Sequence, residues 1–161
     1  MGVEMVIWIL MVASLLMALI SGVFLSFSDF VMRGLVQASG TAGAAAMVGL
    51  NRTVYRSIFM VLFMGLLLGS AALSVLALWK MDDTASYLVV AGALSYIFGV
   101  AAVTGIGNIP LNKHLDAMSE RSGDMAIYWT SYAQRWTWLN HIRTASSAFA
   151  AFSWLTAATL L

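Results

Sequence analysis

The sequence contains no cysteine and only two histidines, His114 and His141. The absence of thiols excludes disulfides, zinc sites with cysteine ligands and iron–sulfur clusters held by cysteine. A haem bundle for electron transfer remains open, but it needs histidines inside its membrane helices. Both histidines here lie in polar segments. We therefore expect no metal and no other cofactor.

Charge is also scarce, since 9% of the 161 residues are charged and 61% are hydrophobic. A soluble domain carries roughly 25% charged residues, so this chain has too few to cover a surface in water. The net charge of +1 gives no indication of a nucleic-acid partner. The composition indicates an integral membrane protein whose main partner is lipid.

Four segments are long and apolar enough to cross a membrane, which takes about 20 residues. They are residues 3–28, 58–79, 87–107 and 144–161. We expect the last helix to begin upstream, near Asp124, and to extend into the cytoplasmic side. The sequence thus predicts an all-α fold, an integral membrane four-helix bundle that forms a single domain over residues 1–161. Because Glu4 stands where a signal peptide has basic residues, we expect no cleavable signal.

Proline occurs once, at Pro110. Proline has no backbone N–H and restricts the residue before it. With Gly105 and Gly107 close by, we expect the third helix to end or bend near Asn108.

Basic residues are distributed unevenly over the connections. Seven lysines and arginines lie in residues 29–57 and 108–143, whereas Lys80 is the only one in residues 80–86. Cytoplasmic loops carry an excess of these residues. We expect 29–57 and 108–143 to be long cytoplasmic loops and both termini to lie outside, in a bacterial inner membrane.

Polar side chains gather at the cytoplasmic ends of all four predicted helices. Such groups near the hydrocarbon boundary usually face the bundle interior, so they could form one pocket. For Asp29 and Arg33, four residues apart, a local ion pair is the alternative. The set comprises Asp29, Arg33, Asn51, Arg52, Asn108, Asn112, Asn140 and Arg143.

The segment before the fourth predicted helix has a stripe of aromatic and polar residues. They follow one another at spacings of 3, 4, 4 and 3, which places them on one helical face. An aromatic wall with a few polar groups suits a flat, partly polar aromatic ligand. Anchoring at the membrane interface is the alternative for the aromatic members. The stripe is Trp129, Tyr132, Trp136, Asn140 and Arg143.

Two amides flank the proline, Asn108 and Asn112. An amide both donates and accepts hydrogen bonds, so this pair could hold a developing oxyanion. A helix-capping role for the same amides stays open.

Several motifs, in order, resemble the anthrone oxygenase-like family of small four-helix membrane proteins. The resemblance spans nearly the whole chain. It implies that Asn108, Asn112, Trp136, Asn140 and Arg143 form the family's polar site. The motifs are residues 21–35 (SGVFLSFSDFVMRGL), 47–54 (MVGLNRTV), 108–115 with Asn108, Pro110 and Asn112, and 129–144 with Trp129, Trp136, Asn140, Arg143 and Thr144.

Some members of that family oxidise anthrones to anthraquinones with dioxygen, without metal or flavin. The resemblance therefore implies a membrane-embedded, cofactor-independent oxygenase for a lipophilic aromatic or phenolic substrate. A base, an oxyanion stabiliser and a dry aromatic slot would be needed. We expect Asp29 or His141 to be the base. The expected stabilisers are Asn108, Asn112 and Arg143, and the expected substrate-binding residues are Asn51, Trp129, Tyr132, Trp136 and Asn140.

Two other functions stay open from the sequence. The chain could be an accessory or structural subunit of a larger membrane complex, in which these motifs are caps and contacts. A transporter would need polar residues at mid-membrane depth, where the predicted helices offer only serine and threonine. The small residues of these helices permit a homodimer or a membrane-protein partner.

Overall fold

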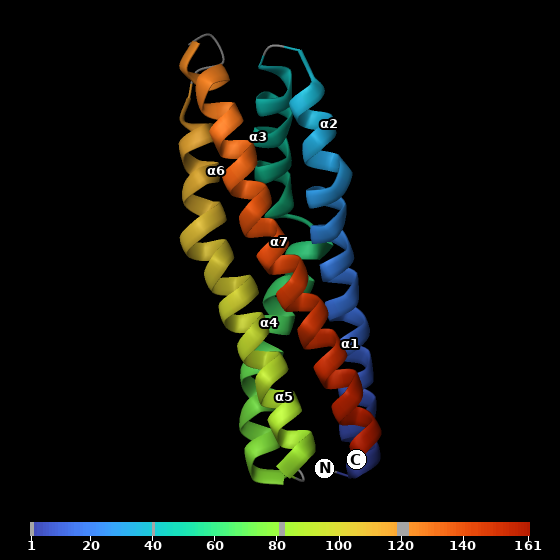
Figure 1. Ribbon diagram of the computed structural model, residues 1–161. Helices are drawn as coiled ribbons and strands as arrows, with labels where there is room; N and C mark the ends of the chain where they lie inside the picture. Colours follow the sequence, from blue (N-terminus) through green and yellow to red (C-terminus); the bar gives the residue numbers. More distant parts are fainter. Residues whose placement is uncertain (1, 40, 81–82, 119–122) are drawn as a thin grey trace.

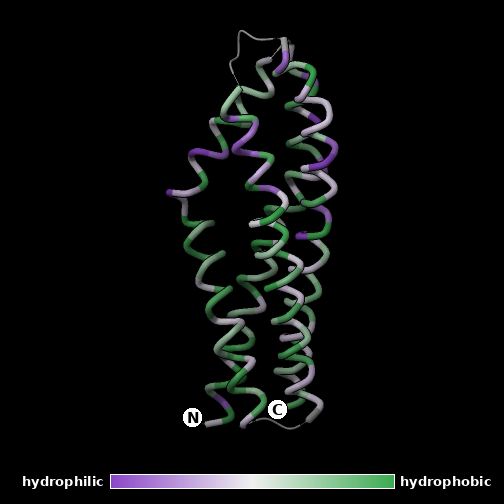
Figure 2. The backbone as a smooth tube through the Cα atoms, turned by 90° about the vertical axis from the view of Figure 1, so that its left-hand side faces the viewer, coloured by the Kyte–Doolittle hydropathy of each residue, from purple (hydrophilic) through white to green (hydrophobic). Residues whose placement is uncertain are grey.

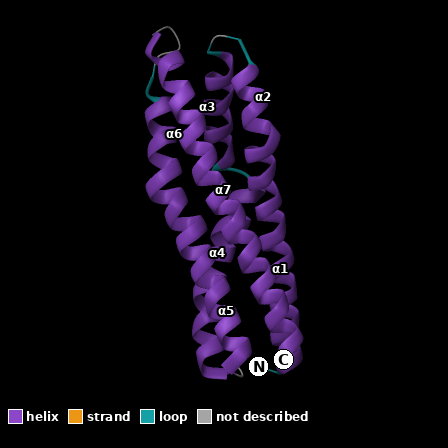
Figure 3. Cartoon of the chain, viewed as in Figure 1, coloured by secondary structure: helices purple, strands orange, loops and turns teal. Residues whose placement is uncertain are grey.

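A computed structural model describes residues 2–39, 41–80, 83–118 and 123–161. The described chain is helical almost throughout and contains no strand (Figure 3). In chain order the helices are α1 (Val3–Ser26), η1 (Phe27–Val31), α2 (Met32–Gln37), α3 (Ala42–Val54), α4 (Ile58–Lys80), α5 (Asp83–Tyr96), η2 (Ile97–Ala102), η3 (Thr104–Asn108), α6 (Ile109–Asp116) and α7 (Gly123–Leu160).

The helices run side by side along an elongated molecule (Figure 1). Both termini lie at one end, and α2, α3, α6 and the start of α7 form the other end. We call the end with α1, α4, α5 and the C-terminal part of α7 the terminal half. The end with α2, α3, α6 and the N-terminal part of α7 is the site half. Helix α7 packs against α1 and α5 in the terminal half and against α6 and α3 in the site half.

Three helical segments are long and apolar enough to cross a membrane: Val3–Gln37, Ile58–Trp79 and Thr84–Asp116. This finding is compatible with an integral membrane protein. The predicted fourth span, residues 144–161, lies in α7 and is not among them. Helix α7 does begin upstream as expected, at Gly123. Hydrophilic residues are concentrated in the site half (Figure 2).

The two halves have separate apolar cores. The terminal core joins α1, α4, α5 and α7 around side chains such as Leu10, Met17, Val89 and Trp154. The core of the site half includes Met32, Met47, Leu115, Met125 and Trp129. Asn108, Asn140 and Arg143 are buried and belong to neither core.

Close approach of α5, η2 and α7 depends on small residues. A Cβ atom on Gly99 would lie 2.0 Å from Ser146 Oγ, and one on Gly92 would lie 2.7 Å from a carbon of the Trp154 ring. Both distances are far shorter than van der Waals contact. Small residues allow such approach where lipid gives helices no hydrophobic reason to associate.

The predicted loops at 29–57 and 108–143 are largely helical. The first contains η1, α2 and α3, and the second contains α6 and the start of α7. Their apolar residues are buried against one another in the site-half core, so packing stabilises helices that hydropathy alone does not indicate. Of the end or bend expected for the third helix near Asn108, the structure does not show an end.

Helical structure continues past Pro110 as far as Asp116. Wide turns precede it, and the Ile109 N–H donates to the Thr104 carbonyl, five residues earlier. Pro110 then falls in the first turn of α6, where a missing N–H costs least. A similar wide turn joins Met32 N–H to the Phe27 carbonyl. Such turns often occur at functional sites.

Candidate functional site

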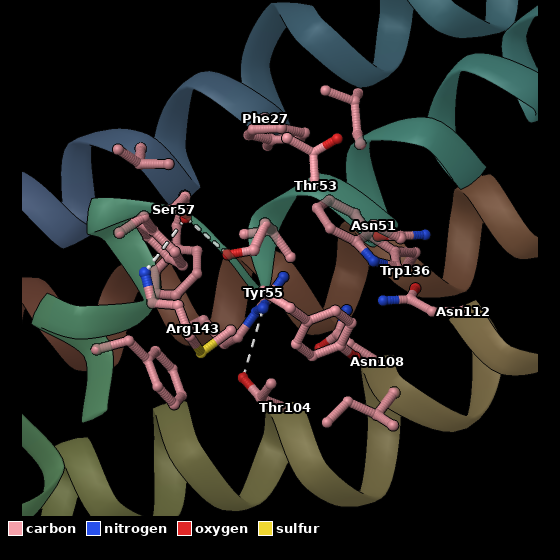
Figure 4. A pocket seen from close by; sticks show the side chains of 18 of the residues that line it. Phe27, Asn51, Thr53, Tyr55, Ser57, Thr104, Asn108, Asn112, Trp136 and Arg143 are labelled. Carbon is pink, nitrogen blue, oxygen red and sulfur yellow. Dashed lines mark hydrogen bonds between the residues drawn. The ribbon is translucent and has the colours of Figure 1, made fainter.

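A cavity of about 300 Å³ lies where the two halves meet (Figure 4). Its size is at the lower end of the range for small-molecule pockets. Helices α1, η1, α3, α4, η3, α6 and α7 all contribute to the lining. Most of its wall is apolar, from Val23, Phe24, Phe27, Met47, Leu50, Val54, Phe59, Met60, Phe63, Ile109 and Trp136.

Part of the cavity lining belongs to the connection between α3 and α4. Tyr55 lies in this connection and lines the cavity, although 54% of it is exposed. Thr53 and Ser57 line the cavity beside it. The lining is therefore partly exposed at this connection.

Arg143 supplies a buried positive charge at the cavity wall, with 6% of the residue exposed. Its guanidinium carbon lies 4.4 Å from the centroid of the Phe24 ring and 5.1 Å from that of Trp136. Aromatic faces attract such a cation. Its Nη1 donates to Thr104 Oγ1 at 3.4 Å, and its Nη2 donates to Asn140 Oδ1 at 2.5 Å.

Asn140 positions Arg143 and does not itself line the cavity. Its Nδ2 donates to the Phe24 carbonyl at 2.5 Å and to Ser28 Oγ at 2.6 Å. Both hydrogens of the amide are therefore used, and the Oδ1 atom is held toward Arg143. Helices α1 and η1 are tied to α7 through this one side chain.

Several polar atoms at the cavity have no hydrogen-bond partner within the described chain. They are both amide atoms of Asn108, Trp136 Nε1 and Arg143 Nε. All three residues are at least 94% buried and line the cavity. Buried polar groups nearly always have partners, so unmatched ones call for an explanation. A ligand with oxygen atoms would supply the missing partners.

A second polar network borders the cavity. The Tyr132 hydroxyl donates to Asn112 Oδ1 at 2.8 Å and accepts a bond from Asn51 Nδ2 at 3.4 Å. Asn51 and Asn112 line the cavity, whereas Tyr132 lies behind them. Burial raises the pKa of the Tyr132 phenol above its ordinary value, so it stays a neutral donor at physiological pH.

The sequence model of the anthrone oxygenase family matches residues 52–153. This match covers more than half of the chain. The chain belongs to the anthrone oxygenase family. No curated protein and no solved structure gives a match.

The region that matches the anthrone oxygenase family includes Asn108, Asn112, Trp136 and Arg143. It does not include Val23 and Phe24 of α1, or Met47, Leu50 and Asn51 of α3, which also line the cavity. The family match therefore covers most of the polar lining of the site and none of the lining contributed by the first helix.

All five residues of the predicted stripe are buried, whereas Trp138 between them is 67% exposed. Of the stripe residues, Trp136 and Arg143 line the cavity. Trp129 does not reach it and instead stacks on Tyr132, with ring centroids 5.4 Å apart. Of the substrate-binding residues predicted elsewhere, Asn51 lines the cavity.

Neither residue predicted as the base lines the cavity. The side chain of Asp29 is 64% exposed and lies 4.0 Å from Arg33, as in the local ion pair considered above. His141 is exposed on α7 and lines an outer groove between η1, α2 and α7. Among the described residues, no three histidine, aspartate or glutamate side chains come together as a metal site.

The sequence interpretation missed Tyr55, Thr104 and the phenylalanines of α1 and α4 as site residues. Thr104 was grouped with the serines and threonines of the membrane runs, and Tyr55 stands beside basic residues typical of an interface. The phenylalanines look like ordinary lipid-facing or core residues. Only the packing of α1 and α4 against η3 and α7 distinguishes them.

Proposed function

We propose that this protein is a membrane-embedded oxygenase that acts with dioxygen on a lipophilic aromatic or phenolic substrate of the anthrone type. The observation that carries the proposal is the cavity itself. It combines an apolar, largely aromatic wall with buried polar atoms of Asn108, Trp136 and Arg143 that lack partners. Membership of the anthrone oxygenase family supports the reaction class.

The reaction is the oxidation of an activated CH₂ group to a carbonyl. Loss of one proton gives an electron-rich anion, which passes an electron to dioxygen. The resulting radicals combine to a hydroperoxide, and loss of water then leaves the quinone. The balance is one anthrone and one dioxygen giving one anthraquinone and one water, with no need for a bound cofactor.

Asn108, Asn112 and Arg143 are the proposed stabilisers of the anion. Preorganised donors in a dry site lower the energy of developing charge far more than in water. Trp136 with Phe24 and Phe27 would hold the flat rings of the substrate. Asp29 and His141, the bases expected from the sequence, do not line the cavity, and each would need a relay to reach it.

For the membrane arrangement we propose four spanning helices, the fourth being the C-terminal part of α7. It packs against α1 and α5, both of which belong to apolar spans. The distribution of basic residues supports a cytoplasmic site half with both termini outside. The cavity would then lie near the membrane interface, where a lipophilic substrate can enter from the bilayer.

The test is dioxygen uptake by the purified protein in lipid nanodiscs with an anthrone, measured above the uncatalysed autoxidation rate. Anthraquinone formation is followed by absorbance. Replacement Asn108→Ala should lower turnover about 100-fold, as loss of one oxyanion-hole donor does. The matched control is Gln134→Ala, an exposed amide on α7, which should turn over normally. Full turnover by a folded Asn108→Ala protein would refute the proposed role of the amide.

A further inference from the structure

Arg143 differs from the two arginines of the described chain that form ion pairs with carboxylates. Arg33 and Arg52 form ion pairs with Asp29 and Asp116, and these side chains are well exposed. Arg143 is buried and has no acidic partner among the described residues. A guanidinium keeps its charge in proteins, and burying an unpaired charge is costly.

The contacts of Arg143 solvate its charge without neutralising it. Asn140 Oδ1 and Thr104 Oγ1 are neutral acceptors, and the Phe24 and Trp136 rings are uncharged. The Nε atom still lacks a partner. This wall of the cavity therefore carries a positive charge that no described residue neutralises.

The cavity also lacks a group that could take up the proton of an acidic ligand. Its lining contains no carboxylate and no histidine within the described chain, and its only titratable residues are Tyr55 and Arg143. Two phenols lie behind the lining: Tyr132 on α7 donates to Asn112, and Tyr96 on α5 donates to the Phe63 carbonyl. The side chains that line the cavity from α1 and α4 are apolar, and those from η3 are the neutral Thr104 and Asn108.

We infer that the ligand binds as an oxyanion, the phenolate or enolate form of an acidic aromatic compound, with Arg143 as its counter-ion. The ligand O–H or C–H bond breaks, the electron pair stays on the ligand, and the proton leaves to the aqueous buffer. No electron is transferred in this step. Arg143 lowers the pKa of the ligand and replaces a protein base. The inference rests on the proposed function, because it assumes that this cavity is the substrate site.

The aromatic wall favours an aromatic anion over the carboxylate of a fatty acid. Phe24, Phe27 and Trp136 border the same space as the guanidinium. Phe27 and Trp136 already contact each other with ring centroids 5.8 Å apart. A flat ring bearing the charge can stack on these rings and contact the cation at once, whereas the chain of a fatty acid packs on the apolar wall but has no ring to stack.

The test measures binding to the full chain in nanodiscs of zwitterionic lipid, without turnover. The probes are a nitronaphthol, which is ionised at neutral pH, its neutral methyl ether, and a medium-chain fatty acid. We expect the naphtholate to bind at least ten times more tightly than the ether and than the fatty acid. Equal binding of naphtholate and ether by the unaltered protein would overturn the inference, and tighter binding of the fatty acid would overturn the choice of an aromatic anion.

Variants then assign the preference to Arg143. Arg143→Lys keeps the charge and should retain most of the preference, whereas Arg143→Met should abolish it. Arg135→Met, an exposed arginine of the same helix, is the matched control and should behave as the unaltered protein does. An undiminished preference in a folded Arg143→Met protein would contradict the assignment; should that variant not fold, the comparison of probes on the unaltered protein still decides.

A weaker acid, an unsubstituted naphthol, gives an independent readout through its own absorbance. Its ionisation midpoint should fall by at least one pH unit on binding, equal to the tenfold preference. An unmoved midpoint together with dioxygen uptake would leave the oxygenase in place and remove this inference. A lowered midpoint without any dioxygen uptake would support binding of the anion and refute the proposed oxygenase.

Discussion

In the terminal half and the site half, the helices are joined by different kinds of hydrogen bond. In the terminal half, side chains donate across to backbone carbonyls: Trp154 Nε1 to Val89 at 2.8 Å, and Tyr96 Oη to Phe63 at 3.3 Å. In the site half they also bond to other side chains, as Tyr132 does to Asn112. A carbonyl in a helix cannot turn away, whereas a side chain can turn toward a ligand. The terminal half is thus built for packing, and the site half can exchange partners.

The junction of the halves should be the most sensitive point. Replacement Asn140→Leu leaves Arg143, Ser28 and the Phe24 carbonyl without the amide that joins them. We expect the free energy of unfolding to fall by about 3 kcal/mol, because a buried charge loses a hydrogen bond. Denaturant unfolding in detergent measures this loss. The control Gln134→Leu, on an exposed position of α7, should change stability little. An equal effect of both replacements would show that Asn140 does not join the halves.

In the terminal half, the free energy of unfolding should depend on side-chain volume alone. Replacement Gly99→Val places a side chain where Ser146 Oγ lies 2.0 Å from the new Cβ. We expect a loss of about 2 kcal/mol from overpacking, with ligand binding kept in the fraction that folds. Thermal unfolding of this variant is compared with that of Gly69→Val, where nothing lies within 4 Å of the added atom. Equal melting temperatures would contradict close packing of η2 on α7.

The site half should respond to loss of a hydroxyl with a smaller change in stability. Replacement Tyr132→Phe removes the bonds to Asn112 and Asn51. We expect a loss of about 1 kcal/mol, because the two amides line the cavity and can find other partners. Ligand affinity should change as well, which the Gly99→Val replacement should not cause.

Folding stability should also depend on pH through the Tyr132 phenol. Burial raises its pKa in the folded protein, so the folded state holds this proton where the unfolded state has lost it. The stabilisation from Tyr132 is complete below a pH of about 10, the ordinary phenol value, and is lost as the pH rises further. The alkaline loss of stability should therefore be smaller in Tyr132→Phe. An identical pH profile would show that this phenol is not linked to folding.

Part of the site could be predicted from the sequence: Trp136 and Arg143 from helical periodicity in α7, and Asn108 and Asn112 from the two amides that flank Pro110. Asn108, Asn112, Trp136 and Arg143 were predicted together and all line the cavity. Asp29 and His141 were predicted as bases because their side chains can accept a proton, but the sequence does not show where these side chains point. Neither of them lines the cavity. The wide turn over Phe27–Val31 changes the rotation of the first helix, and Asp29 lies on its exposed side.

By itself, the sequence determined that the chain is helical, that long apolar helices can cross a membrane, and that one face of α7 is buried. These properties depend on composition and on the 3.6-residue period, which are local. Only the tertiary structure decided which polar groups meet. The placing of Thr104 beside Arg143, and of Asn140 against Phe24 and Ser28, depends on how each helix is rotated against its neighbours. Contacts between helices set that rotation, since small residues such as Gly99 permit an approach that no single segment encodes.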